Sequence, residues 1–143
     1  MQVSNIEIST DKERLDIPYI HAFLTNSYWA KGISVDLVRS SIEHSFCFGL
    51  YQDGSQIGFA RVITDFTIFA YLADVFIDEK ERGRGLGVKL VETIMSHQNL
   101  QGLRRWHLLT SDAQGLYRRF GFETPVAPDT HMEKKVNAEQ LYG

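Results

Sequence analysis

The chain has 143 residues, of which 43% are hydrophobic and 23% are charged, and both fractions are typical of a globular domain with a sizeable core. A formal net charge of −3 argues against a protein that binds nucleic acid through a broad basic surface. The single cysteine, Cys47, excludes an internal disulfide and a zinc site built from several cysteines. The five histidines show no metal-ligand spacing, so no metal is expected.

The sequence also bounds the location of the protein and the number of its domains. No apolar run approaches the length of a transmembrane helix, and the N-terminal residues 1–5 lack the basic and apolar regions of a signal peptide. We therefore expect a cytoplasmic protein with no membrane partner and no nucleic-acid partner. No repeat or linker interrupts the chain, which predicts a single domain over residues 3–137 and a C-terminal tail over residues 138–143.

The first third of the chain predicts one strand and two helices. Alternating isoleucines indicate a strand over residues 3–10. Asp16 can cap a helix that runs to about residue 26, because its side chain can accept a hydrogen bond from a free N–H group of the first turn. After a loop, either Ser34 or Asp36 can cap the second helix.

Three strands of an antiparallel meander are predicted next. They cover residues 46–52, 56–64 and 68–78. Asp53-Gly54 is a hairpin turn signal between the first two strands. The third strand is apolar and rich in strand-forming residues, so it is expected to be buried.

A basic, glycine-rich turn, Arg82-Gly-Arg-Gly-Leu-Gly87, joins the third strand to a helix that runs from about Gly85 to Gln98. Glycine lets the backbone approach a ligand, and a helix N-terminus presents unpaired N–H groups and a positive dipole end. The turn is therefore a predicted phosphate-binding site. The dinucleotide fingerprint and the P-loop both fail, because each requires glycine where Val88 stands. A nucleotide-binding protein is accordingly disfavoured.

The last third of the chain predicts a strand over residues 105–110 that pairs in parallel with the strand over residues 68–78, because it follows a strand and a helix. A short helix over residues 112–120 begins at an acidic cap and stops at Gly121. Two final strands are predicted over residues 122–123 and 131–136, and residues 137–143 are expected to be frayed or to form a short helical turn.

Two motifs together resemble those of the GCN5-related N-acetyltransferase (GNAT) superfamily. Arg82, Gly85 and Gly87 form R-x-x-G-x-G, which resembles the pyrophosphate-binding motif Q/R-x-x-G-x-G/A. Tyr117-Arg-Arg-Phe-Gly-Phe122 resembles the family's Y-x-x-x-G-F element. The predicted order β-α-α-β-β-β-α-β-α-β-β also matches the family. The resemblance implies an α/β (α+β) fold with a mixed central sheet of six to seven strands flanked by about four helices.

The resemblance implies acetyl-CoA as the cosubstrate and assigns it to particular residues. The backbone of residues 75–77 would pair with the pantetheine arm, and an N–H near Phe76 would hold the acetyl carbonyl oxygen. The N–H groups of residues 82–88 would hold the pyrophosphate. Thr110 stands where many members have asparagine, so only a hydroxyl is present for that contact. The expected cofactor-binding residues are Val75, Phe76, Ile77, Arg82, Gly83, Arg84, Gly85, Leu86, Gly87, Val88, Thr110 and Tyr117.

Tyr117 and Asp74 are the catalytic candidates. By resemblance, Tyr117 is the general acid toward the departing thiolate; the alternative is a packed core aromatic. Asp74 shares a strand face with Leu72 and Phe76 if the alternation is unbroken. A carboxylate in that apolar setting is either the base or a structural group bonded to the backbone or to a neighbour such as Arg61. A route through water to Asp74 stays open.

Tyr28 and Trp29 lie in the connection that lines the acceptor site in this family, where they either bind the substrate or hold the loop on the core. The expected acceptor is a primary amine of a small molecule or peptide, and the negative net charge favours a cationic one. His107, in a strand, is interpreted as structural. A homodimer is compatible with the resemblance. Two functions remain: an N-acetyltransferase that acts by direct attack, and a non-catalytic acyl-CoA-binding module of the same fold.

Overall fold

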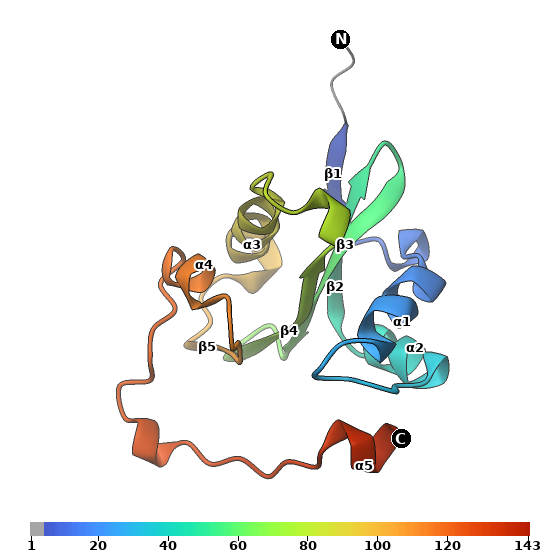
Figure 1. Ribbon diagram of the computed structural model, residues 1–143. Helices are drawn as coiled ribbons and strands as arrows, with labels where there is room; N and C mark the ends of the chain where they lie inside the picture. Colours follow the sequence, from blue (N-terminus) through green and yellow to red (C-terminus); the bar gives the residue numbers. More distant parts are fainter. Residues whose placement is uncertain (1–4) are drawn as a thin grey trace.

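The computed structural model describes residues 5–143, so residues 3 and 4 of the first predicted strand lie outside it. Within the described residues, five strands form one sheet in the order β1-β2-β3-β4-β5 (Figure 1). Neighbouring strands are antiparallel except β4 and β5, which are parallel as predicted. The strands are β1 Ile6–Ser9, β2 Phe46–Gln52, β3 Ser55–Thr64, β4 Phe69–Ile77 and β5 Arg105–Leu108.

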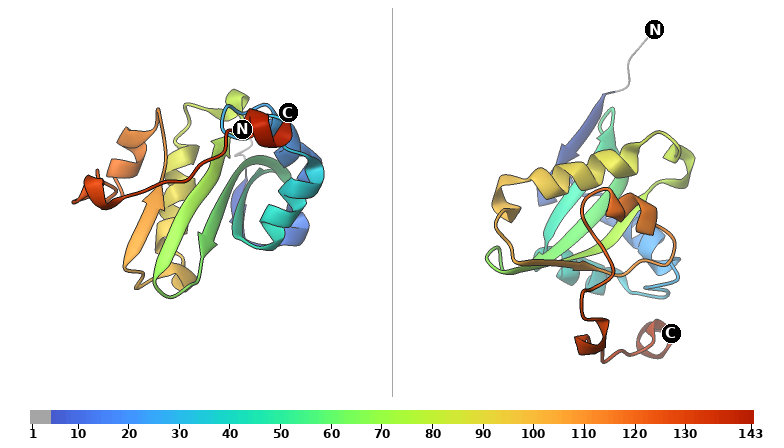
Figure 2. Two further views of the ribbon diagram at one scale, coloured as in Figure 1. Left: turned by 90° about the horizontal axis from the view of Figure 1, so that it is seen from below. Right: turned by 90° about the vertical axis from the view of Figure 1, so that its left-hand side faces the viewer.

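Helices cover both faces of the sheet. Helices α1 and α2 lie on one face, and α3 and α4 lie on the other (Figure 1 and Figure 2). None of the helices in residues 5–143 is long and apolar enough to cross a membrane. The α-helices of this range are α1 Ile17–Thr25, α2 Val35–Glu43, α3 Leu86–Ser96, α4 Gln114–Arg118 and α5 Ala138–Tyr142.

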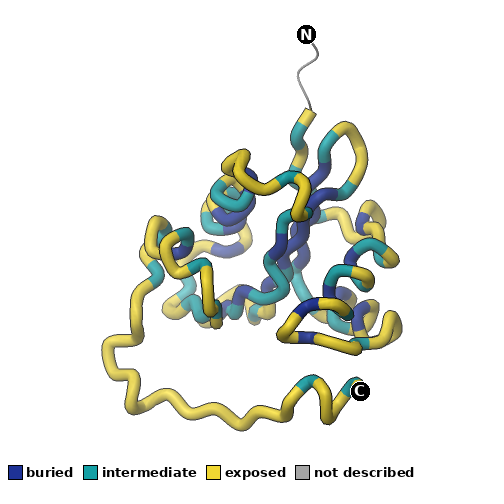
Figure 3. The backbone as a smooth tube through the Cα atoms, in the orientation of Figure 1, coloured by how far each residue is buried: buried dark blue, intermediate teal, exposed yellow. Residues whose placement is uncertain are grey.

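Two apolar clusters fill the spaces between the sheet and its helices, and the buried residues follow the strands and the inner helix faces (Figure 3). Leu90, Val91 and Ile94 of α3 are fully buried on one side of the sheet. Ile20 of α1 and Val38 of α2 are fully buried on the other. Each such side chain contributes about 2 kcal/mol to the free energy of unfolding, so both helical layers are held firmly on the sheet.

Side-chain caps decide where α1 and α2 begin. The Asp16 carboxylate accepts a hydrogen bond of 3.1 Å from the backbone N–H of Tyr19. The Ser34 hydroxyl accepts one of 3.2 Å from the N–H of Leu37. Ser34 is therefore the cap of α2, and the alternative at Asp36 is wrong.

A β-bulge interrupts the pairing of β3 with β4. Phe59 pairs with Phe76, but Arg61 pairs with Ala73, so β4 has one extra residue in between. Asp74 lies in this bulge with φ of +53°, a conformation that costs a non-glycine residue about 1 kcal/mol. The bulge reverses the direction of the side chains that follow it.

The bulge corrects the predicted face of Asp74. Leu72 packs in the cluster beneath α3, whereas Phe76 packs in the cluster beneath α1 and α2. The two residues therefore lie on opposite faces of the sheet, and the expectation that Asp74 shares one face with both is wrong. The prediction assumed unbroken alternation, which the extra residue removes.

The parallel pair of β4 and β5 is short. Its register joins Phe69–Leu72 to Arg105–Leu108 and ends there. From Ala73 onward, β4 is paired with β3 but not with β5. The backbone of the second half of β4 is thus open on the side of β5, and the two strands diverge at this point.

The last two predicted strands are wrong. Residues 122–123 and 131–136 form no strand in the described range, so the sheet has five strands rather than six or seven. After α4 the chain makes a 3-10 turn, Pro128–Thr130, and then runs extended without a strand partner. Residues 138–142 form α5, as one of the two expectations for the tail. A strand needs a hydrogen-bonding neighbour, and local sequence alone does not supply one.

Candidate active site

The glycine-rich turn leads into α3, and the first backbone amides of that helix are free. Gly83 and Gly85 have φ of +83° and +74°, which only glycine adopts without strain. The first hydrogen bond of the helix joins the N–H of Lys89 to the carbonyl of Gly85 at 3.1 Å. The three N–H groups of residues 86–88 precede that bond, and no side chain caps them. Such an end attracts an anion through both its donors and its dipole.

The two arginines of this turn are held differently. Arg82 donates its Nε to the carbonyl of Ile77 at 3.3 Å. Arg84 forms an ion pair with Glu81 and donates to the Gln52 side chain at 2.9 Å. The positive charge of Arg84 is therefore balanced locally, and Arg82 is the arginine of the pair that forms no ion pair with the described residues.

The open half of β4 directs alternate amides away from β3. The N–H of Asp78 donates to the carbonyl of Ile57 on β3 at 2.7 Å. Because N–H groups alternate along a strand, the N–H of Phe76 also faces β3. The N–H groups of Val75 and Ile77 face the open side, where β5 has diverged.

Asp74 lies at the point of divergence, and each of its carboxylate oxygens accepts a hydrogen bond from a protein group. Its Oδ1 accepts a hydrogen bond from the indole N–H of Trp29 at 2.8 Å. Its Oδ2 accepts one from Nε of Arg61 at 2.8 Å, and this ion pair is largely buried. Arg61 in turn donates to the hydroxyl of Ser45 at 3.0 Å. The contact with Arg61 matches the structural alternative of the sequence analysis.

The connection between α1 and α2 crosses the opening between the strands. Trp29 is bonded to Asp74 on β4, and the Tyr28 hydroxyl is 3.0 Å from the hydroxyl of Ser111, which follows β5. The two rings contact each other edge to face, with centroids 5.1 Å apart. Tyr28 remains 70% exposed, so it is held by this hydrogen bond rather than by burial in the core.

Tyr117 lies on α4 with its ring buried. Burial and, to a smaller extent, the negative charge of Asp112 raise the pKa of Tyr117 to about 12. The phenol therefore keeps its proton at neutral pH. The helix ends at Arg118, two residues before the predicted end at residue 120. Gly121, with φ of +90°, lies in the turn that follows, and the N–H of Phe122 donates to the carbonyl of Tyr117 at 3.3 Å.

Thr110 caps the turn that precedes α4. Its hydroxyl accepts a hydrogen bond of 3.0 Å from the N–H of Ala113. The expected cap at Asp112 is wrong, because the helix begins at Gln114 and no side chain caps its first residue. Thr110 and Tyr117 both line a cavity of about 570 Å³ beside β5.

A stack of three rings was not predicted from the sequence. Tyr71 and His107 are register partners on β4 and β5, and their rings stack with centroids 5.7 Å apart. The ring of His131 stacks on the other side of His107 at 5.9 Å. The parallel pairing could have placed the first two together, but nothing local predicts the path of the chain at His131. No group of three or more metal-ligating side chains occurs in residues 5–143.

The uncapped amides at the start of α3 and the unpaired edge of β4 suit a long ligand with one anionic end. The anionic end can bind the amides that begin α3, while the rest of the ligand lies along the open edge of β4 toward Asp74.

Comparison with known proteins gives the family. The family model described as acetyltransferase (GNAT) domain matches residues 43–124. A Gibberella zeae protein that carries the name of an acetyltransferase is 32% identical over 133 residues, covering 77% of this chain and 74% of its own. The spermine/spermidine N(1)-acetyltransferase of Bacillus subtilis is 29% identical, covering 91% and 94%.

A solved structure agrees with both matches. The crystal structure of a GNAT-family protein from Xanthomonas campestris pv. campestris is 48% identical and has a TM-score of 0.92, covering 96% of this chain and 97% of its own. The chain belongs to the GNAT family of acetyltransferases. It is an N-acetyltransferase with acetyl-CoA as its cosubstrate.

Proposed function

We propose that the chain transfers acetyl directly from acetyl-CoA to a positively charged primary amine of a small molecule or peptide. The main support is the arrangement at the end of the opening, where Trp29 is bonded to Asp74 and Tyr28 to Ser111. Aromatic faces and a carboxylate both attract cations. The Bacillus subtilis relative is named for spermine and spermidine, which are cationic amines.

The cosubstrate lies along the open half of β4 in this proposal. The free N–H groups of residues 86–88 bind its diphosphate, with Arg82 nearby, the arginine of this turn that forms no ion pair with a described residue. Its pantetheine arm pairs with the amides of Val75 and Ile77, which face the open side. The N–H of Val75 directly follows Asp74 and is the donor for the acetyl carbonyl oxygen. This assignment differs from the expected donor near Phe76, because the N–H of Phe76 faces β3.

Tyr117 is the general acid in this proposal. The amine nitrogen attacks the thioester carbonyl carbon, the carbonyl oxygen takes negative charge, and the C–S bond breaks as the carbonyl reforms. The departing sulfur takes a proton from the Tyr117 hydroxyl, and the resulting phenolate regains a proton from water as the attacking nitrogen releases its extra proton to water. A pKa of about 12 supports this role, because the hydroxyl is protonated at every physiological pH.

The carboxylate of Asp74 has two candidate roles, as the base or as a positioning residue. Each oxygen already accepts one hydrogen bond from protein, so its free lone pairs can reach the substrate ammonium directly or through one water. As a base, Asp74 takes the ammonium proton before attack. As a positioning residue, it holds Trp29 over the opening and attracts the cation.

Two variants separate these roles. Asp74→Asn keeps an oxygen that can accept from the Trp29 indole but removes the basic carboxylate. Trp29→Phe keeps the carboxylate and removes only the indole donor. If Asp74 is the base, kcat falls about 100-fold or more in Asp74→Asn, and the pH profile of kcat in this variant lacks the acidic limb. In Trp29→Phe, kcat should change much less. Equal, small losses in both variants would leave Asp74 with the positioning role alone.

The proposed function is tested by following release of free thiol from acetyl-CoA with a panel of amines. The panel contains spermidine, a diamine, a monoamine of equal length, and a neutral alcohol as the control. We expect turnover with the charged amines and none with the alcohol. Absence of turnover with every amine, by protein that CoA stabilises against heat, would overturn the proposed acceptor class.

A further inference from the structure

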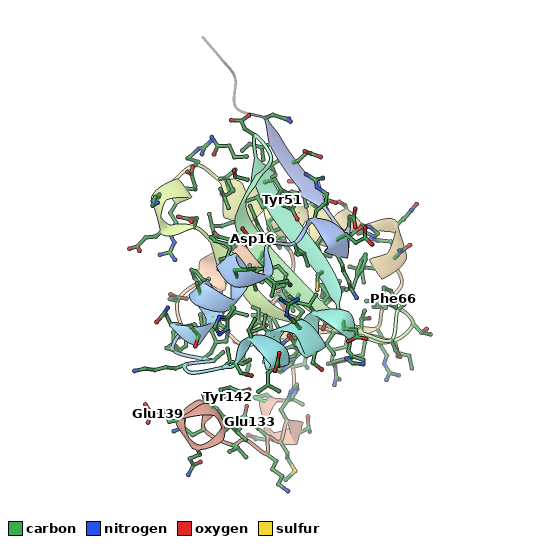
Figure 4. The ribbon with its side chains drawn as sticks, turned by 90° about the vertical axis from the view of Figure 1, so that its right-hand side faces the viewer. Asp16, Tyr51, Phe66, Glu133, Glu139 and Tyr142 are labelled. Atoms are coloured by element: carbon green, nitrogen blue, oxygen red, sulfur yellow. The ribbon has the colours of Figure 1, made fainter. Side chains whose placement is uncertain are left out.

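The C-terminal arm, residues 131–143, crosses the part of the sheet that α1 and α2 leave uncovered on their own face. Seen from below, it runs from α4 past β5 and β4 toward the connection between α1 and α2 (Figure 2). Glu133, Glu139 and Tyr142 of the arm all lie at the end of the domain that is far from Tyr51 (Figure 4). The path of the arm brings it to the acceptor side of the opening.

The arm contacts the sheet through His131. Its ring stacks on His107 with centroids 5.9 Å apart and planes inclined by 21°. His107 stacks on Tyr71 at 5.7 Å and 24°. Tyr71 lies three residues before Asp74 on β4, so the stack forms a continuous wall that begins beside the carboxylate and ends on the arm.

The far end of the arm contacts the acceptor loop. Gly32, three residues after Trp29, has φ of +87°. A Cβ placed on it would lie 3.4 Å from both the Cβ and the backbone oxygen of Tyr142 in α5. The arm therefore touches β5 at one end and the α1–α2 connection at the other.

Glu133 lies between these two contacts. Burial raises the pKa of the Tyr71 hydroxyl, and the negative charges of Asp74 and then Glu133 raise it further. Glu133 follows His131 by only two residues, and His131 stacks on His107, which stacks on Tyr71, so the arm also brings the Glu133 carboxylate to the neighbourhood of this phenol. Asp74 forms an ion pair with Arg61, whereas Glu133 is exposed and forms no ion pair with the described residues.

We propose that the C-terminal arm is the outer wall of the acceptor site and that Glu133 binds a second positive charge of an elongated acceptor, such as a diamine or polyamine. This inference rests on the proposed amine acetylation. One amine of the acceptor reaches the acetyl group near Asp74, and its distal ammonium lies between the ring wall and Glu133. His131 is a positioning residue that holds the arm on the sheet.

The test compares a diamine with a monoamine of the same chain length. In Glu133→Gln, we expect the ratio of kcat/KM for the diamine to kcat/KM for the monoamine to fall about 5-fold at low salt, the size of an exposed charge pair. The fall should shrink at 0.5 M salt because exposed charges are screened. Glu139→Gln is the matched control, since it removes an equal charge from the same arm on α5, and it should keep the wild-type ratio.

A second variant tests the arm without changing its carboxylate. His131→Ala removes the ring contact and should raise KM for the diamine several-fold while the calorimetric Kd for CoA stays at the wild-type value. An unchanged ratio in Glu133→Gln, or an equal change in Glu139→Gln, would overturn the inference. Failure of wild-type protein to acetylate any amine would instead overturn the proposed function itself.

Discussion

A pair of glycine substitutions in the turn before α3 gives the sharpest test of cosubstrate binding. Gly85 has φ of +74°, and a Cβ added there would meet no described atom within 4 Å. Alanine at this position is therefore limited by backbone strain alone, which costs about 1 to 2 kcal/mol. Gly87 lies in the first turn of the helix, and its added Cβ would meet only Leu116 Cδ2 at an ordinary 3.8 Å.

The two variants should shift the free energy of unfolding in opposite directions. Gly85→Ala should lower it by about 1 kcal/mol. Gly87→Ala should raise it by about 0.5 kcal/mol, because alanine loses less backbone entropy in a helix. Urea unfolding followed by circular dichroism measures both values.

The binding of CoA should separate the variants further. Relief of strain in Gly85→Ala turns the amides of residues 86–88 away from the diphosphate. Loss of one hydrogen bond to a charged group is worth about 2 kcal/mol, so the calorimetric Kd should rise at least about 10-fold. Gly87→Ala keeps these amides in place and should bind within about 3-fold of wild type. Tight binding by Gly85→Ala, or a greater loss in Gly87→Ala, would refute the idea that these amides hold the diphosphate.

Four further outcomes follow from individual residues. Tyr117→Phe should lower kcat about 100-fold while leaving the Kd for CoA unchanged, which stopped-flow thiol release and calorimetry measure separately. The folded-state pKa of Tyr117, about 12, exceeds the ordinary value of 10.0, so the unfolded phenol ionises first. The raised pKa of Tyr117 therefore stabilises the folded state fully below about pH 10, and this contribution is lost between about pH 10 and 12. Urea titrations should show the free energy of unfolding falling by on the order of 2 kcal/mol over this range, and by less in Tyr117→Phe. Leu90→Ala in the core and Ser34→Ala at the cap of α2 should lower the free energy of unfolding by about 3 and about 1 kcal/mol respectively in the same assay.

Elements with local signals agree best with their predictions. β2 has the predicted bounds because Asp53-Gly54 makes the hairpin turn that ends it. Helix α1 begins at its predicted cap, Asp16, because the capping bond spans only three residues. The parallel pairing of β4 with β5 follows from connection handedness and length, which sequence order alone reveals.

Features that depend on distant contacts were missed. The bulge at Asp74 depends on how β3 and β4 align, and no residue type announces it. Residues 131–136 have a strand-like pattern, but the chain after Pro128 has no strand partner in the described range and lies across the sheet instead. The wall formed by Tyr71, His107 and His131 depends on that path, so it was equally hidden.

The candidate site also contains features with local signals, which were predicted, and features that depend on distant contacts, which were not. The glycine turn and the helix start were predicted, because both are encoded within six consecutive residues. The contact of Asp74 with Arg61 was one of two predicted alternatives, since the antiparallel meander brings their strands together. The bonds of Tyr28 and Trp29 were not predicted, because they depend on how a loop crosses two strands.

Both tryptophans of the chain lie at the candidate site. Trp29 donates its indole N–H to Asp74, and Trp106 lines the cavity beside Tyr117. Tryptophan emission, selectively excited, therefore reports on Trp29 at the opening and on Trp106 at the cavity beside β5. Replacing either indole with phenylalanine leaves a single emitter, so cosubstrate and amine arrival can be timed separately in a rapid-mixing instrument without attaching a dye.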